Sequence, residues 1–203
     1  MLLIGGPPGA GKTTLARSLA SRLGWMSTTV DDLVTAARAF TDPQSHPDLH
    51  RSKGVGHHEY FTEGPPDRLI ADAVALENAM WPVLQRLIHR HGADRAPIVL
   101  DWWLFNPEKV ADLPTREAKS IWLHIDPLVL DERERANTEF REGSADPERM
   151  HDNFMARSYW RNDLIHGQAT AAGLPVIQQP GDRSVDDLAN EAIRILGGPS
   201  VFG

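Results

Sequence analysis

The sequence predicts an α/β fold built on a parallel sheet, and three observations support this. A glycine-rich pattern that fits G-x-x-x-x-G-K-[ST] occupies residues 6–13, directly after a short apolar run. Five apolar runs of strand length alternate with helical segments along the 203 residues. Two of these runs lead into aspartates, at Asp31 and Asp101. Alternating strands and helices favour right-handed crossovers, with a functional site along the carboxyl edge of the sheet.

The glycine-rich pattern has the strand–loop–helix context of a phosphate-binding loop. Residues 2–4 predict a buried strand, and leucines at helical spacing over 15–23 predict a helix that stops at Gly24. Glycine lets a backbone wrap closely around an anion, while amides and the helix N-terminus supply positive charge. The predicted nucleoside triphosphate contacts are Gly6, Pro7, Pro8, Gly9, Ala10, Gly11, Lys12 and Thr13, with Thr14 as an additional contact.

Two side chains of this loop have expected roles of their own. Lys12 would reach the β- and γ-phosphates, and the Thr13 hydroxyl would hold Mg²⁺. The alternative is a glycine-rich turn that only caps a helix. The four fixed positions match by chance in roughly one chain in a hundred of this length. We therefore expect ATP and Mg²⁺ as cofactors, with GTP left open.

The composition narrows the class of protein. With 41% hydrophobic and 24% charged residues, it is typical of a globular chain. No apolar run approaches the roughly 18 residues of a membrane span. The net charge of -7 disfavours a nucleic-acid partner, although it allows a local basic pocket. The absence of cysteine suits a reducing cytoplasm, and no cleavable signal is expected before the loop. We expect one cytoplasmic domain over 1–203.

The second predicted strand, residues 25–30, leads into Asp31 and Asp32 and then a short helix. A carboxylate at the end of a strand beside a phosphate loop lies where open α/β sheets bind ligands. It can accept the proton of an attacking hydroxyl. Asp31, the first residue after the strand, is the predicted base. Asp32 is predicted to cap the helix or to make a second substrate contact, and a purely capping role for one of the pair is the alternative.

Residues 41–66 predict a long polar loop, which is usually functional or disordered. Its histidines, Arg51 and Lys53 could face an anionic acceptor, or the segment could be a solvated surface. Residues 57–58 are two adjacent histidines, which we do not expect to bind metal because no carboxylate partner is suitably spaced.

A long helical pattern begins at Pro66 and continues to Leu87. Pro82 lies within it and is expected to kink or divide the helix. Glu77 and Asn78 fall off the apolar stripe and are expected at the surface.

The third predicted strand, residues 97–100, ends in Asp101. An apolar strand followed by aspartate is the Walker B arrangement, whose acid holds Mg²⁺ directly or through water. Trp102 and Trp103 follow. One of them is expected to line the acceptor site, for which we take Trp102, and simple core packing is the alternative.

The fourth predicted strand, residues 119–126, leads into a helix at Pro127 and then an arginine-rich segment interrupted at 143–147. Arginines on a hinged segment suit a lid that closes over phosphates. The alternative is a solvated helix pair, since glutamates interleave with them at salt-bridge spacing. Arg133 and Arg141 are the predicted ligand contacts, ahead of the other arginines of the segment, which are Arg135, Arg149, Arg157 and Arg161.

The fifth predicted strand spans 173–177, and a turn at 180–182 follows it. Ser184 and Asp187 have the spacing of a capping box for a last helix that runs to Leu196. Residues 199–203 are expected to fray.

The phosphate loop, the second strand and Val30-Asp31-Asp32-Leu33 together resemble the small-metabolite kinases of the P-loop superfamily. These include shikimate, gluconate and 2-phosphoglycerate kinases and chloramphenicol phosphotransferases. The resemblance implies a three-layer P-loop NTPase fold, a five-stranded parallel sheet of order 2-3-1-4-5, and an arginine-bearing lid. It implies an acceptor-binding region at 42–92 and a lid region at 133–165. It also implies that Asp31 contacts the acceptor hydroxyl and that the turn at Gly181 passes the adenine, for which a plain connecting loop is the alternative.

Our leading hypothesis is a kinase that transfers the γ-phosphoryl group of ATP to a hydroxyl of a small molecule. The predicted catalytic residues are Asp31, Lys12, Arg133 and Arg141. Substrate contacts are expected from Asp31, Asp32, Asp101 and Trp102, and metal contacts from Thr13 and Asp101. The alternatives are a nucleotide-gated switch or assembly ATPase acting on a protein partner, and a nucleic-acid end kinase. The sequence does not identify the acceptor or the oligomeric state.

Overall fold

The computed structural model describes residues 1–51, 55–114 and 118–198. In this part of the chain, five strands form one parallel sheet in the order β2-β3-β1-β4-β5. The predicted fold class and strand order are confirmed. The strands are β1 (Leu2–Gly5), β2 (Met26–Thr29), β3 (Ile98–Trp102), β4 (Lys119–Ile125) and β5 (Val176–Gln179).

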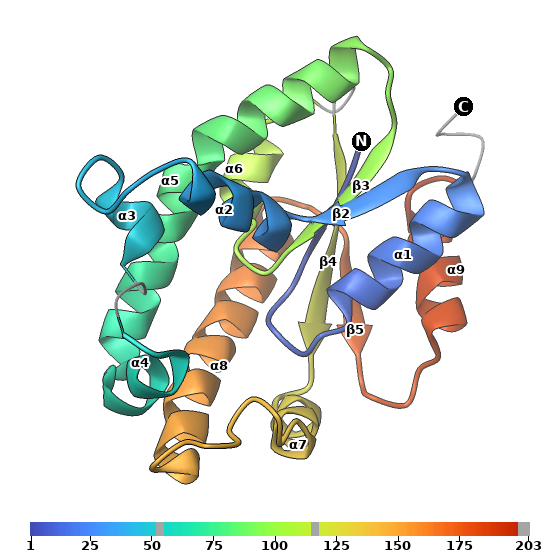
Figure 1. Cartoon of the computed structure of the whole chain (residues 1–203). Coiled ribbons are helices and arrows are strands. Elements are labelled where there is room, and N and C mark those ends of the chain that lie inside the picture. Colours follow the sequence, from blue (N-terminus) through green and yellow to red (C-terminus); the bar gives the residue numbers. More distant parts are fainter. Residues whose placement is uncertain (52–54, 115–117, 199–203) are drawn as a thin grey trace.

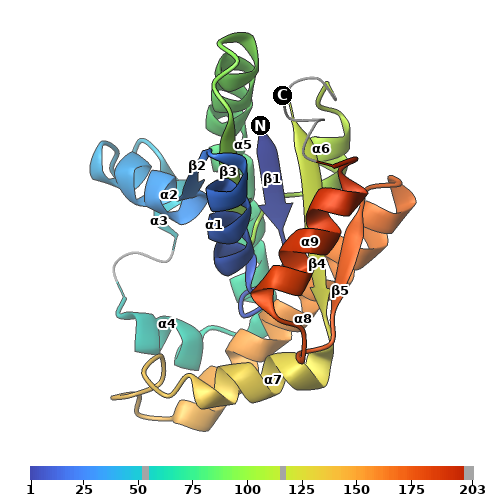
Figure 2. The same ribbon diagram turned by 90° about the vertical axis from the view of Figure 1, so that its right-hand side faces the viewer.

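Helices cover both faces of the sheet. Figure 1 shows α1 and α9 on one side and α5 and α8 on the other, with α7 beyond the carboxyl ends of β4 and β5. Figure 2 looks at the molecule from the side of α1 and α9, so that α9 lies in front of β4 and β5. The helices of the described residues are α1 (Lys12–Leu23), α2 (Val30–Ala39), α3 (Pro47–His50), α4 (His57–Glu63), α5 (Pro66–Ala93), α6 (Pro107–Ala111), α7 (Pro127–Ala136), α8 (Pro147–Ala171) and α9 (Val185–Ile195). None of these helices has the length and apolar character needed to cross a bilayer.

Strand β1 divides its side chains between two cores. Leu2 and Ile4 pack in the cluster that includes residues of α1 and α9, and Leu3 packs in the cluster that includes residues of α5. All three side chains are fully buried, as expected for a parallel sheet covered on both faces. At Gly5 a Cβ atom would lie 2.2 Å from the Trp122 indole, so this position has no room for a side chain.

The segment predicted as a long loop, residues 41–66, contains two helices, so that prediction is wrong. Leu49 of α3 and Tyr60 and Phe61 of α4 are buried. The Phe61 ring makes an edge contact with Phe154 of α8, with the ring centroids 5.5 Å apart. Aromatic burial against α8 therefore orders a segment whose polar composition alone favours a loop. Lys53 and the expected frayed end at 199–203 lie outside the described residues.

Helix α5 runs unbroken through Pro82, so of the two outcomes predicted for this proline, a kink or a division of the helix, division is wrong. An internal proline costs about 3 kcal/mol in a helix. Here Met80 and Leu84, two residues before and two residues after the proline, are fully buried in the core. Tertiary packing therefore holds the helix together across the proline.

Glu77 of α5 is buried, with 4% of its surface exposed, so its expected surface position is wrong. Its Oε1 lies 2.7 Å from Lys109 Nζ, and its Oε2 lies 3.7 Å from Nη1 of Arg161. Arg161 in turn donates from Nε to the carbonyl oxygen of Trp103 at 2.8 Å. Ion pairing makes the burial of Glu77 tolerable, and the network fixes the backbone that follows β3.

Replacing Glu77 with alanine should destabilise the protein by about 3 kcal/mol, because it leaves the buried Arg161 cation without its carboxylate partner. Urea unfolding followed by circular dichroism measures the change. Glu108→Ala, at an exposed position of α6, is the control and should shift the free energy of unfolding by less than about 0.5 kcal/mol. Equal effects of the two variants would show that the network does not stabilise the fold.

Candidate functional site

Residues 6–11 connect β1 to the N-terminus of α1, in the strand–loop–helix arrangement expected from the sequence. Gly11 is the N-cap of α1 with φ +88°, in the left-handed region that favours glycine. The first turn of α1 directs its amides toward the loop, where the helix dipole also favours an anion. The backbone here is therefore suited to bind phosphate groups.

The Lys12 side chain lies inside this loop. It is 9% exposed, and its Nζ donates a hydrogen bond to the carbonyl oxygen of Pro7 at 2.7 Å. Burial lowers its pKa to about 8, while the negative charges of Asp101 and Asp31 oppose that shift. The ammonium group thus lies inside the loop, and the charge of a bound anion would offset the free-energy cost of burying it.

Thr13 and Asp101 come together across the sheet edge. Thr13 Oγ1 donates to Asp101 Oδ2 at 2.7 Å, and Asp101 is buried at the C-terminal part of β3. Burial raises the pKa of Asp101, and the hydrogen bond from Thr13 and the charge of Lys12 oppose that rise. A hydroxyl and a carboxylate oxygen are the hard ligands that Mg²⁺ prefers, so the pair fits the expected cation.

Asp31 lies in the first turn of α2, and Trp102 Nε1 donates to its Oδ1 at 3.1 Å. Partial burial raises the pKa of this carboxyl, and Lys12 is the largest opposing influence. The side chain still reaches solvent. Asp31 is therefore an oriented carboxylate that remains open to a small molecule.

The predicted capping role of Asp32 is wrong. The helix begins at Val30, three residues before the start that a cap at Asp32 predicts, and Thr29 is its N-cap with Oγ1 accepting from the Asp31 amide. Asp32 is exposed in the first turn, where a negative charge favours the helix dipole. It is not among the residues that line the cavity beside Asp31.

That cavity has a volume of about 320 Å³. Asp31 lies in its wall, and the other walls come from α3, α4, α5, the end of β3 and α8. Its lining combines aromatic and charged groups, among them Tyr60, Trp103 and Arg157. A cavity of this size and mixed chemistry suits a small polar molecule.

The prediction that Trp102 lines the acceptor site is not supported by the structure. Trp102 is the last residue of β3 and is fully buried in the core that faces α5. Its contribution is the hydrogen bond that orients Asp31. The tryptophan that lines the cavity is Trp103, because it begins the loop after the strand and stands half-buried.

Arg133 of α7 connects two segments that are both predicted to contact the nucleotide. Its Nη1 donates to the carbonyl oxygen of Gly9 at 3.1 Å, and its Nη2 to that of Gly181 at 3.5 Å. Gly181 has φ +103°, and a Cβ there would lie 2.7 Å from Val129. The structure therefore brings Arg133, Gly9 and Gly181 together.

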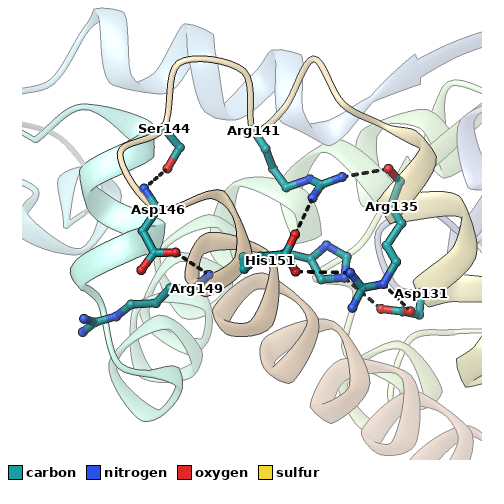
Figure 3. Close-up of polar contacts among 8 residues, drawn as sticks. Asp131, Arg135, Arg141, Ser144, Asp146, Arg149 and His151 are labelled. Atoms are coloured by element: carbon teal, nitrogen blue, oxygen red, sulfur yellow. Dashed lines mark hydrogen bonds and ion pairs between the residues drawn. The ribbon is translucent and has the colours of Figure 1, made fainter.

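The other lid arginines interact with neighbouring side chains and backbone. Arg141 donates from Nη2 to the carbonyl oxygen of Arg135 at 2.7 Å and lies 3.8 Å from a carboxylate oxygen of Glu148 (Figure 3). Arg135 pairs with Asp131 at 2.8 Å. Arg149 is exposed and pairs loosely with Glu63 at 4.0 Å. Within the described residues, no hydrogen bond or ion pair joins Arg141 to the phosphate loop, so the structure does not bring it to the site as predicted.

Much of the predicted lid region, 133–165, belongs to α8. This helix packs against the sheet, and Met150, Phe154 and Ile165 are buried in the two cores. The residues that extend beyond the sheet as a separate layer are those of α7 and the segment 137–146 (Figure 1). The part of the predicted lid region that lies beyond the sheet is therefore 133–146.

Two residues of the site were missed in the sequence. Glu134 of α7 is half-buried against the phosphate loop, where a Cβ at Gly9 would lie 2.6 Å from its Oε1. Burial raises the pKa of this carboxyl. Arg157 of α8 lines the cavity, although Arg133 and Arg141 were preferred over it. In the sequence Glu134 lies within a run of alternating charges, and Arg157 is one of six arginines of the same segment, and neither pattern indicates which side chains turn inward.

The loop, the parallel sheet and the paired Thr13 and Asp101 define a nucleotide-binding α/β protein of the P-loop class. The sequence matches the model of the AAA domain family over residues 1–157, and the chain belongs to that family. No curated protein is similar enough in sequence to match it.

Solved structures share the fold at low sequence identity. Shikimate kinase from Acinetobacter baumannii, in complex with shikimate, is 17% identical with a TM-score of 0.58, covering 96% of this chain and 91% of that one. Shikimate kinase from Bacteroides thetaiotaomicron is 17% identical with a TM-score of 0.55, covering 96% and 97%. A gluconokinase from Sinorhizobium meliloti 1021 is 14% identical with a TM-score of 0.51, covering 95% and 89%. At these identities the likeness establishes the fold alone.

Proposed function

We propose that this protein is a kinase that transfers the γ-phosphoryl group of ATP to a hydroxyl group of a small molecule. One observation carries the proposal. Asp31 lines the 320 Å³ cavity and also lies close enough to Lys12 of the phosphate loop for each charge to shift the pKa of the other. A phosphate-binding loop and a small-molecule cavity thus meet at one oriented carboxylate.

The proposed reaction follows from that juxtaposition. The acceptor oxygen forms a bond to the γ-phosphorus as the bond from this phosphorus to the β,γ-bridging oxygen breaks, and the hydroxyl proton passes to Asp31. Trp102 keeps the Asp31 carboxyl oriented. The raised pKa of Asp31 makes it a better proton acceptor than an ordinary aspartate. Lys12 and Arg133 supply positive charge beside the loop.

Thr13 and Asp101 are the residues that would hold Mg²⁺. When bound, this ion neutralises phosphate charge and helps to position the triphosphate. The hydrogen bond between Thr13 and Asp101 holds these two oxygens next to each other before the ion binds.

A screen of hydroxyl compounds by ³¹P NMR tests the proposal. The protein is incubated with ATP and Mg²⁺ and, in separate samples, with polyols, hydroxy acids, sugar phosphates and a 5′-hydroxyl oligonucleotide. We expect a phosphate monoester signal and matching ADP with a small-molecule acceptor. ATP hydrolysis at one slow rate in every sample would contradict the proposal and favour a nucleotide switch. Transfer to the oligonucleotide alone would identify a nucleic-acid end kinase.

Replacing Glu134 with glutamine should tighten ATP binding roughly fivefold, since it removes a negative charge beside the phosphate loop, worth on the order of 1 kcal/mol. The pKa of Glu134 is raised, so the wild-type carboxyl becomes neutral as the pH falls through that raised value. The difference between the two proteins should therefore shrink at low pH. Calorimetric titration with ATP measures both effects, and Glu132→Gln, at an exposed position, is the control. Weaker binding by Glu134→Gln would contradict the expectation.

A further inference from the structure

Arg157 is a buried cation in the cavity wall. It belongs to α8, and 7% of its surface is exposed. Its Nε atom is buried without a hydrogen-bond partner. Within residues 1–51, 55–114 and 118–198, no hydrogen bond or ion pair joins its guanidinium group to another residue. A buried charge normally has a partner, because the loss of hydration is otherwise uncompensated.

Aromatic rings surround this guanidinium. The Arg157 Cζ atom lies 4.5 Å from the centroid of the Trp103 ring, 4.8 Å from that of Phe61 and 5.1 Å from that of Phe154. Cation–π contacts of this kind stabilise the group. They are not hydrogen bonds to its N–H donors, and those donors are arranged in a planar fork that matches an oxyanion.

The carboxylates of the same cavity already have partners. Asp48 pairs with Arg51 at 2.8 Å, and Asp72 lies 3.6 Å from Arg51 and accepts from the Tyr60 hydroxyl at 3.1 Å. Asp31 accepts from Trp102. Burial lowers the pKa of Arg157 to about 10, so it is still a cation at neutral pH. Among the described residues, none supplies an anionic partner in hydrogen-bond or ion-pair contact with this cation, so its charge is available to a ligand.

We propose that the phosphoryl acceptor carries a carboxylate or phosphate group, which Arg157 binds while the acceptor hydroxyl faces Asp31. This inference rests on the proposed function and names the substrate class of the same site. Both residues line the one cavity, and its 320 Å³ admits a compound of the size of a small hydroxy acid or sugar phosphate. Because the planar fork of N–H donors matches an oxyanion, Arg157 favours an acceptor with an anionic group over a neutral one.

Calorimetric titrations with matched compounds test the inference. The probes are glycerol, glycerate and glycerol 3-phosphate, together with sorbitol, gluconate and glucose 6-phosphate, each added in the presence of ADP and Mg²⁺. We expect an anionic member of at least one set to bind about tenfold or more tightly than its neutral counterpart, as charged hydrogen bonds contribute that much. The carboxylate and phosphate members separate the two sources of negative charge. Wild-type protein that prefers no anion over its neutral counterpart would overturn the inference.

Substituted proteins locate the anion. Arg157→Met keeps the apolar stem and should abolish the preference, and Arg157→Lys should restore it only in part, because lysine lacks the planar fork. Arg90→Met, at an exposed position of α5, is the matched control and should leave binding unchanged. An anion seated in the phosphate loop would instead lose affinity in Lys12→Ala and keep it in Arg157→Met, which would also overturn the inference.

The two proposals fail in distinguishable ways. Transfer to neutral alcohols, without any preference for anions, would leave the kinase proposal standing and refute the role of Arg157. Anion binding lost in Arg157→Met, in a protein that phosphorylates none of the compounds, would support the anion site and count against the kinase proposal. Thermal melting of each variant shows whether its fold is retained, and the wild-type comparison decides the inference without any variant.

Discussion

Lys12→Ala should lower kcat/KM for phosphoryl transfer by about 10²- to 10³-fold, the typical loss when one preorganised charge-stabilising donor is removed. Lys12 lies inside the phosphate loop, with its Nζ 2.7 Å from the carbonyl oxygen of Pro7, and no other described lysine lies in that loop. A coupled assay for ADP release, with the best acceptor of the ³¹P screen, measures the change. Near-normal turnover in a correctly folded variant would refute the assignment of this loop as the ATP site.

The pH dependence of ATP binding gives an independent check on Lys12. Burial lowers its pKa to about 8 in the free protein, and a bound phosphate group favours the charged form. Affinity should therefore be highest below pH 8 and should weaken as the pH rises through that value. Lys12→Ala should remove this dependence. Calorimetric titrations between pH 7 and pH 9 would show it, and an identical profile in both proteins would place the titrating group elsewhere.

Asp31→Asn should lower kcat by about 10²- to 10⁴-fold, the range expected for loss of a general base. The amide keeps the shape of the side chain and can still accept from Trp102, but it cannot take the hydroxyl proton. ATP affinity should change less than about threefold. Equal losses in turnover and in ATP affinity would indicate that Asp31 supports the structure of the loop instead.

The same variant predicts a change in the pH profile. The pKa of Asp31 is raised, so the wild-type rate should fall as the pH drops through that raised value and the carboxylate becomes protonated. The residual activity of Asp31→Asn should lack this acidic limb. Asp32→Asn, one residue along and outside the cavity, is the matched control and should keep both the rate and the profile. A retained acidic limb in Asp31→Asn would identify another base.

The sequence predicts the strand order through a resemblance and the phosphate loop through its own residues. The sequence also predicts that Thr13 and Asp101 lie close together, because the phosphate loop and the Walker B aspartate both follow strands that end at the carboxyl edge of one parallel sheet. Local patterns suffice for these features. The start of α2 at Val30 was missed because Thr29, an equally good cap, precedes two aspartates that are also good caps.

The remaining errors concern which way a side chain faces. Trp102 and Trp103 are identical in type, and only the residue at which β3 ends decides which one enters the core. The helical pattern places Glu77 at the surface, because it does not include the ion pairs that Lys109 of α6 and Arg161 of α8 make with this carboxylate in the fold. Arg157 differs from its neighbouring arginines only in the aromatic rings that the fold collects around it. Such choices depend on contacts between distant segments, which spacing along one helix does not contain.

Arg133 reaches across the nucleotide side of the molecule and binds two main-chain carbonyls, at Gly9 and Gly181. Both of its partners are backbone atoms, so a change of side chain at either glycine does not delete the acceptor. These two hydrogen bonds can be lost by mutation of Arg133 itself or by displacement of the backbone at Gly9 or Gly181. If α7 moved away from the phosphate loop and the turn at Gly181, both hydrogen bonds would break, so Arg133 couples the position of α7 to both of these segments.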